Sequence, residues 1–168
     1  MIFPQMKGTT LAGERLSLPA DLGDGPAVLL VALAENRHQI ASCWIPYVKQ
    51  LEQLYDDLCT FEVFVLGRAN LLTRYLSTSR LRSAIPNPSA RARAVPLYVD
   101  RGAFCQALGL PADAAVHILL LDATREVVWK ARGPVAPEKV QSLAKALADA
   151  HEQDDAEPAI SSERGSVH

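Results

Sequence analysis

Three cysteines, Cys43, Cys59 and Cys105, are the first residues whose chemistry deserves a test. Dithiol–disulfide exchange needs one cysteine whose thiolate is stabilised at a helix N-terminus, and a second cysteine one turn later that resolves the mixed disulfide. The chain contains no Cys-x-x-Cys pair. The number of cysteines is odd and each lies in apolar sequence, which is typical of reduced thiols that act as small hydrophobic residues. The spacing therefore argues against dithiol exchange.

Cys43 is the remaining candidate for thiol chemistry, as the single cysteine of a thiol peroxidase or related oxidoreductase. It lies about two turns into a helix that we predict to begin at Asn36. Stabilisation of a thiolate by the helix dipole fades within the first turn. The position therefore favours a packed, unreactive thiol beside Trp44, and the peroxidase is kept as the alternative function.

His38 would lie in the first turn of the same helix. Asn36 is predicted to cap this helix, with Gln39 three residues later as its capping-box partner. A neutral imidazole in the first turn could donate a hydrogen bond to a ligand or accept one. No Cys, Asp or Glu stands at metal-ligand spacing from His38, so we predict no metal site. The chain also lacks a phosphate loop, a nucleophile elbow and His-Glu-x-x-His, so no cofactor is predicted.

The stretch from Val63 to Val99 contains no acidic residue but is rich in arginine. Its arginines are Arg68, Arg74, Arg80, Arg82, Arg91 and Arg93. In a chain of net charge −2 this basic patch favours an acidic protein partner, a phosphate-bearing ligand or an anionic membrane surface. Such runs are also typical of a solvated helix face. Few aromatic residues are interleaved with the arginines, so nucleic-acid binding is not predicted.

Length and composition fit one domain with a short appendage: 168 residues, 18.2 kDa, 49% hydrophobic and 21% charged. The longest apolar run, Ala27–Ala34, is too short for a membrane-spanning helix, and the N-terminus lacks the features of a signal peptide. Cytoplasmic residence is therefore predicted. Residues 1–150 should form the domain and residues 151–168 a flexible acidic and polar tail. The oligomeric state does not follow from the sequence.

Strands and helices alternate along the chain. Short apolar runs predict strands over Ala27–Ala34, Phe61–Leu66, Pro96–Val99, Val116–Leu121 and Glu126–Lys130. Apolar residues spaced three and four apart, with capping residues, predict helices from Asn36, over Asn70–Leu81, between Asp100 and Gly109, and from Pro137. Pro46 lies inside the first helix and should bend it. This order predicts an α/β fold in which a central mixed sheet has helices on both faces.

The order of elements resembles the thioredoxin-like superfamily, in its peroxiredoxin-like and thiol-reductase-like branch. An N-terminal extended arm over Phe3–Pro19, the strand Val28–Ala34 and the helix kinked at Pro46 carry this resemblance. Within the superfamily the chain is most similar to the thioredoxin-like assembly factors of mitochondrial ATP synthase and their bacterial relatives. The matching residues are Phe3-Pro4, Leu18-Pro19, Ala27–Ala34, Gln39, Trp44, Arg91–Arg93, Leu97-Tyr98 and Trp129. The resemblance implies a three-layer thioredoxin-like fold.

The resemblance also implies where redox residues would stand. Counted back from Pro46, the two cysteines of the superfamily's motif fall at His38 and Ala41, or at Arg37 and Ile40 after a one-residue shift, and neither register contains a cysteine. Counted back from Asp122, the superfamily's cis-proline falls at Val116, so that feature is not expected either. The implied binding cleft is formed by Asn36, Arg37, His38, Gln39, Val116 and His117. The expected function is therefore that of a redox-inactive protein-binding or assembly module with a protein partner. A peroxidase that uses Cys43 is the alternative.

Overall fold

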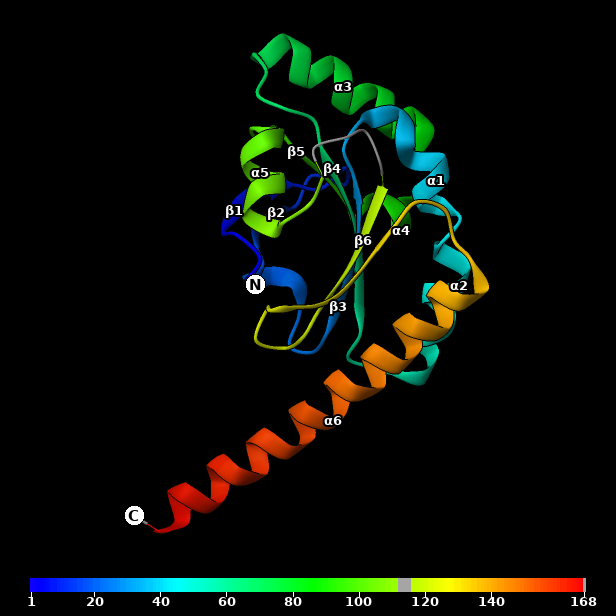
Figure 1. The fold of residues 1–168 in the computed structure, drawn as a ribbon. Helices are drawn as coiled ribbons and strands as arrows, with labels where there is room; N and C mark the ends of the chain where they lie inside the picture. The colour runs from blue at the N-terminus through cyan, green and yellow to red at the C-terminus, as the bar shows by residue number, and fades with distance from the viewer. Residues whose placement is uncertain (112–115, 168) are drawn as a thin grey trace.

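The computed structural model describes residues 1–111 and 116–167, and the side chains of its C-terminal helix as far as Gln153. Its centre is a five-stranded sheet in the order β5-β4-β3-β6-β7 (Figure 1). The strands are β3 (Ala27–Ala32), β4 (Cys59–Val65), β5 (Ala94–Leu97), β6 (Val116–Leu121) and β7 (Val127–Arg132). The first three are parallel, whereas β6 and β7 run antiparallel to their neighbours. The predicted mixed sheet is confirmed.

Helices cover this sheet on both faces. They are α1 (His38–Ser42), α2 (Ile45–Leu54), α3 (Leu71–Ala84), α4 (Pro88–Arg91), α5 (Arg101–Leu108) and α6 (Pro137–Val167). Apolar residues of α1, α2, α6 and the C-terminal half of α3 pack on one face of the sheet. Those of α5 and of the N-terminal arm pack on the other. The result is the three-layer α/β arrangement expected from the alternating sequence.

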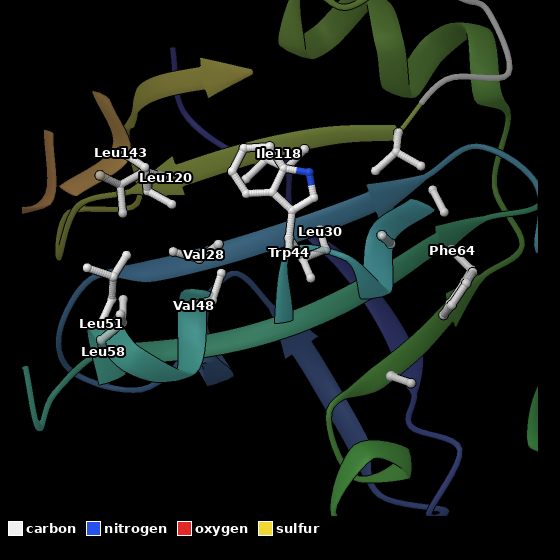
Figure 2. Packing of buried hydrophobic residues seen from close by; sticks show 14 of the residues in the cluster. Val28, Leu30, Trp44, Val48, Leu51, Leu58, Phe64, Ile118, Leu120 and Leu143 are labelled. Carbon is white, nitrogen blue, oxygen red and sulfur yellow. The ribbon is translucent and has the colours of Figure 1, made fainter. Parts of the chain in front are cut away.

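Trp44 is the centre of the first of these layers. Its side chain is fully buried against the sheet beside Leu30, Val48 and Ile118 (Figure 2). The indole Nε1 donates a hydrogen bond of 3.0 Å to the carbonyl oxygen of Gly133, in the loop that leads to α6. One residue therefore ties the junction of α1 and α2 both to the sheet and to the chain that precedes α6.

The N-terminal arm forms a two-stranded antiparallel sheet of β1 (Met6–Thr9) and β2 (Arg15–Leu18). The backbone amide of Leu11 donates to the carbonyl oxygen of Ala94, which lies on the edge strand β5. Gly8 allows this close approach, because a Cβ atom at that position would lie 2.7 Å from the side chains of both Val95 and Leu97. The arm is therefore an integral layer of the fold.

Local caps occur at the ends of two predicted helices. The Asn70 side chain accepts from the backbone amide of Thr73 at the start of α3. The Asp100 side chain accepts from the amide of Ala103 at the start of α5, and Gly109 ends that helix in the left-handed conformation. These ends match the sequence prediction because side chain and backbone partner lie within three residues of each other.

The prediction that Asn36 caps the first helix is wrong. A 3₁₀ turn over Glu35–Arg37 precedes α1, and no side-chain hydrogen bond caps either segment. The predicted single bent helix is divided into α1 and α2, and Pro46 lies in the first turn of α2, where its missing N–H costs no helical hydrogen bond. At the other end of the chain α6 continues as a helix to Val167, beyond the predicted domain end at residue 150. The separate tail over residues 151–168 stays a prediction.

Within the part of the chain that the structure describes, no helix is long and apolar enough to cross a membrane.

Candidate functional site

A histidine–glutamate pair lies at the start of α1. His38 is the first residue of this helix, and its Nδ1 donates a hydrogen bond of 2.8 Å to Oε2 of Glu62. Glu62 comes from β4, next to β3, and its side chain is only 7% exposed. The His38 ring also contacts the ring of Phe64, two residues further along β4 on the same face. A buried carboxylate thus fixes one nitrogen of the imidazole.

The carboxylate changes the acid–base behaviour of the imidazole. The hydrogen bond that His38 donates to Glu62 raises the pKa of His38 above its ordinary value of 6.5, although partial burial acts in the opposite direction. The negative charge of Glu62 adds to the increase. The pair therefore favours the protonated imidazole more strongly than a histidine in water would.

A cavity of about 570 Å³ lies next to the histidine–glutamate pair, and Glu62 is one of its lining residues. Its floor is the sheet, with Leu30, Thr60 and Glu62, and its walls are α2 and the segment that contains α4. The lining residues are Leu30, Ile45, Val48, Lys49, Glu52, Gln53, Thr60, Glu62, Asn87, Ser89, Ala90 and Arg93. The volume lies within the range of small-molecule and peptide-binding pockets.

Two buried polar atoms in this region have no hydrogen-bond partner in the structure. One is the hydroxyl oxygen of Thr60, a residue of the cavity floor. The other is Nε of Arg37, which precedes His38 in the chain. Because an unsatisfied buried polar group costs about 1–3 kcal/mol, a bound group that supplied the missing partners would offset that cost.

The predicted cleft residues are only partly brought together. Asn36 and Gln39 are exposed beside His38, and Val116 packs in the same apolar layer as α1. His117 is buried opposite Val31, whose side chain faces the other layer. His38 and His117 therefore lie on opposite faces of the sheet. Among the described residues the only cis peptide bond is Leu18–Pro19, so the Val116–His117 bond is trans.

The thiols are distributed away from the start of α1. The prediction that Cys43 is packed within the first helix is wrong, because Cys43 lies between α1 and α2 and is exposed, and its Sγ donates to the carbonyl oxygen of Gln39 at 3.3 Å. Ala41, at the place of the second redox cysteine, is buried. Cys105 is buried in the layer of α5, and Cys59 is half-buried at the start of β4. No two of these thiols form a disulfide in the structure.

Two of the arginines in the predicted basic patch have carboxylate partners. Arg80 is 2.6 Å from Glu35, and Arg93 is 2.9 Å from Glu52. Arg82 and Arg91 donate to backbone carbonyl oxygens, which anchors the segment around α4. The two remaining arginines, Arg68 and Arg74, are exposed at the beginning of α3, where Arg74 donates to the carbonyl oxygen of Ala69.

Glu62 is the site residue that the sequence analysis missed. A signal was present, because a single carboxylate interrupts the apolar run of the predicted strand Phe61–Leu66. A buried carboxylate needs a partner, so its position on a buried strand could have indicated one. Among the described residues no three His, Cys, Asp or Glu side chains are grouped to hold a metal ion.

Comparison with solved structures identifies the fold. The thioredoxin domain of a thiol-disulfide oxidoreductase from Bacteroides vulgatus superimposes with a TM-score of 0.60 and 14% identity, over 88% of this chain and 96% of that one. A thiol-disulfide oxidoreductase from Bacteroides fragilis gives 0.60 and 12%, over 88% and 99%. A candidate electron-transfer protein from Aquifex aeolicus gives 0.65 and 12%, over 89% and 96%. No protein-family model matches the chain, and no curated protein matches it.

Proposed function

We propose that this thioredoxin-like fold serves as a protein-binding module that carries out no thiol–disulfide exchange. The observation that supports it most directly is the residue at the start of α1. In this fold a redox thiol at that position would gain from the helix N-terminus, but the residue is His38, which is hydrogen-bonded to the buried Glu62. Ala41, one turn later, is buried and carries no reactive group.

The same region has the properties of a recognition site. Asn36 and Gln39 offer exposed amide groups beside His38, and the 570 Å³ cavity adds a recess with an unpartnered hydroxyl at Thr60. An extended segment of a partner protein could supply backbone donors and acceptors to these groups. An assembly or chaperone-like role in the cytoplasm is part of the proposal.

A redox role through Cys43 is the competing function. The structural neighbours named above include thiol-disulfide oxidoreductases, and the Cys43 side chain is exposed to solvent. Against this role, the thiol follows the C-terminal end of α1 and has only a backbone carbonyl oxygen as its hydrogen-bond partner. Reactive cysteines have a stabilised thiolate, whereas the Cys43 thiol gives a hydrogen bond to a backbone carbonyl oxygen, which a thiolate could not give.

Reaction with hydrogen peroxide separates the two functions. We expect the reduced protein to be oxidised no faster than free cysteine, because the Cys43 thiol donates to the Gln39 carbonyl oxygen rather than standing as a stabilised thiolate. Stopped-flow kinetics with mass spectrometry for sulfenic acid would measure this, and Cys43→Ser would be the control. Rapid oxidation that disappears in Cys43→Ser would make the protein a peroxidase and overturn the proposed function.

Site-directed photo-crosslinking tests the binding half of the proposal. A benzophenone amino acid in place of Gln39, beside His38, is expected to give a discrete protein adduct in cells. The same substitution at Glu14, which is exposed on the N-terminal arm, is the matched control and should give none. The adduct should be at least about tenfold weaker when His38→Ala is added, since the site then loses a polar contact. Equal adducts from both positions would contradict a binding site at α1.

A further inference from the structure

Helix α3 begins with a group of exposed apolar side chains, here called the α3 apolar patch: Leu71, Leu72, Tyr75 and Leu76. Their exposed fractions are 83%, 68%, 67% and 46%. The spacing i, i+1, i+4 and i+5 places them on one face of the helix. Soluble proteins rarely expose such a contiguous apolar group to water, so the patch indicates an interaction surface.

The patch does not belong to the core of this molecule. Along α3 only Ser77 and Leu81 are buried, and all residues before Ser77 are exposed. Figure 1 shows α3 at the end of the molecule opposite to the C terminus, and only its C-terminal half contributes to the helical layer on the sheet. The exposed N-terminal half of α3 can therefore contact a partner surface without any rearrangement of the fold.

The charge around the patch is positive. No acidic residue occurs between Val63 and Val99, and Arg68 and Arg74 are exposed at the beginning of α3. The Arg74 guanidinium lies 5.3 Å from the centre of the Tyr98 ring, and its Nε donates to the carbonyl oxygen of Ala69. Arg68 and Arg74 therefore place positive charge at the end of α3 that carries the leucines, and the Arg74 guanidinium is at the same time held against the Tyr98 ring.

We propose that the α3 apolar patch docks on a membrane surface that contains anionic lipids. The leucines and Tyr75 would enter the boundary between headgroups and acyl chains, where aromatic side chains with a polar tip are favoured. Arg68 would contact lipid phosphates, and Arg74 would add long-range attraction toward the anionic surface. The composition supports a lipid surface over a protein one, because leucine contributes little to protein hot spots whereas it inserts readily into lipid.

Vesicle co-sedimentation of the full chain tests this docking. The probes are vesicles of phosphatidylcholine alone and of phosphatidylcholine mixed equally with phosphatidylglycerol. We expect binding to the anionic vesicles only, and weakening by at least about tenfold in Leu71→Ser/Leu72→Ser and in Arg68→Gln/Arg74→Gln. Leu54→Ser is the matched control, because Leu54 is an equally exposed leucine, at 75%, on α2 and away from the patch. Its binding should equal that of the unmodified chain.

Insertion has its own readout. In Tyr75→Trp, the new indole should shift its fluorescence to shorter wavelength when anionic vesicles are added. Absence of binding, equal binding to both vesicles, or full binding by Leu71→Ser/Leu72→Ser would overturn the proposal. Concentration-dependent dimerisation that is lost in the same variant, without vesicle binding, would assign the patch to a second copy and also overturn it. The outcome is independent of the peroxide assay, which tests Cys43 alone.

Discussion

Replacement of Trp44 by alanine is expected to lower the free energy of unfolding by about 3–5 kcal/mol. The indole is fully buried, so its removal leaves a cavity between the sheet and the junction of α1 and α2 (Figure 2). The variant also loses the hydrogen bond to Gly133 and the edge-to-face contact with Trp129, whose ring centre is 6.4 Å away. Urea denaturation followed by circular dichroism would measure the loss.

Trp44→Phe separates packing from hydrogen bonding. Phenylalanine keeps most of the aromatic volume but leaves the Gly133 carbonyl oxygen without its donor, so a smaller loss, about 1–2 kcal/mol, is expected. A loss below about 1 kcal/mol for Trp44→Ala would show that the indole does not hold the junction to the sheet.

The second large effect is a pH-dependent loss of stability in His38→Ala. This variant leaves the buried carboxylate of Glu62 without its partner, and a loss of about 1–3 kcal/mol is expected on the acidic side of neutrality. The pKa of His38 is raised in the folded state, so the protonated imidazole stabilises the fold fully below 6.5, its ordinary value. That contribution disappears as the pH rises through the folded-state pKa.

Urea denaturation at a series of pH values between about 5.5 and 9 would check the sign. The difference in unfolding free energy between the unmodified chain and His38→Ala should be largest at the acidic end and shrink toward the alkaline end. Glu62→Gln should remove the same pH-dependent part, because the imidazole then loses its charged partner. His38→Ala/Glu62→Leu should recover stability relative to His38→Ala, since no buried carboxylate remains. Parallel curves at all pH values would refute the coupling.

The fold could be predicted from the sequence to the extent that its signals are local. The run Val116–Leu121 corresponds to β6 at both ends, and Asp100 and Gly109 bound α5 as expected. Asn36 does not cap α1 because it lies inside the 3₁₀ turn Glu35–Arg37, which connects β3 to α1. Cap chemistry therefore predicts a helix start only where the preceding chain permits it.

The site was predicted less completely because its contacts join distant segments. His38 was identified from its place before Pro46, but its partner Glu62 lies on another strand, and only the β3–β4 register brings the two together. In the same way, the sequence does not show that Glu35 neutralises Arg80 across 45 positions.

The two edges of the central sheet have a consequence for how the protein can associate. On one edge β5 is short, contains Pro96, which has no amide proton, and already accepts a hydrogen bond from the Leu11 amide at Ala94. On the other edge, the Val127 amide donates to the carbonyl oxygen of Met1. These contacts cover the beginning of each edge strand, so pairing with a strand from another chain is restricted there and edge-to-edge stacking, the route to fibrous aggregates, is disfavoured. We therefore expect the concentrated protein to resist cross-β assembly.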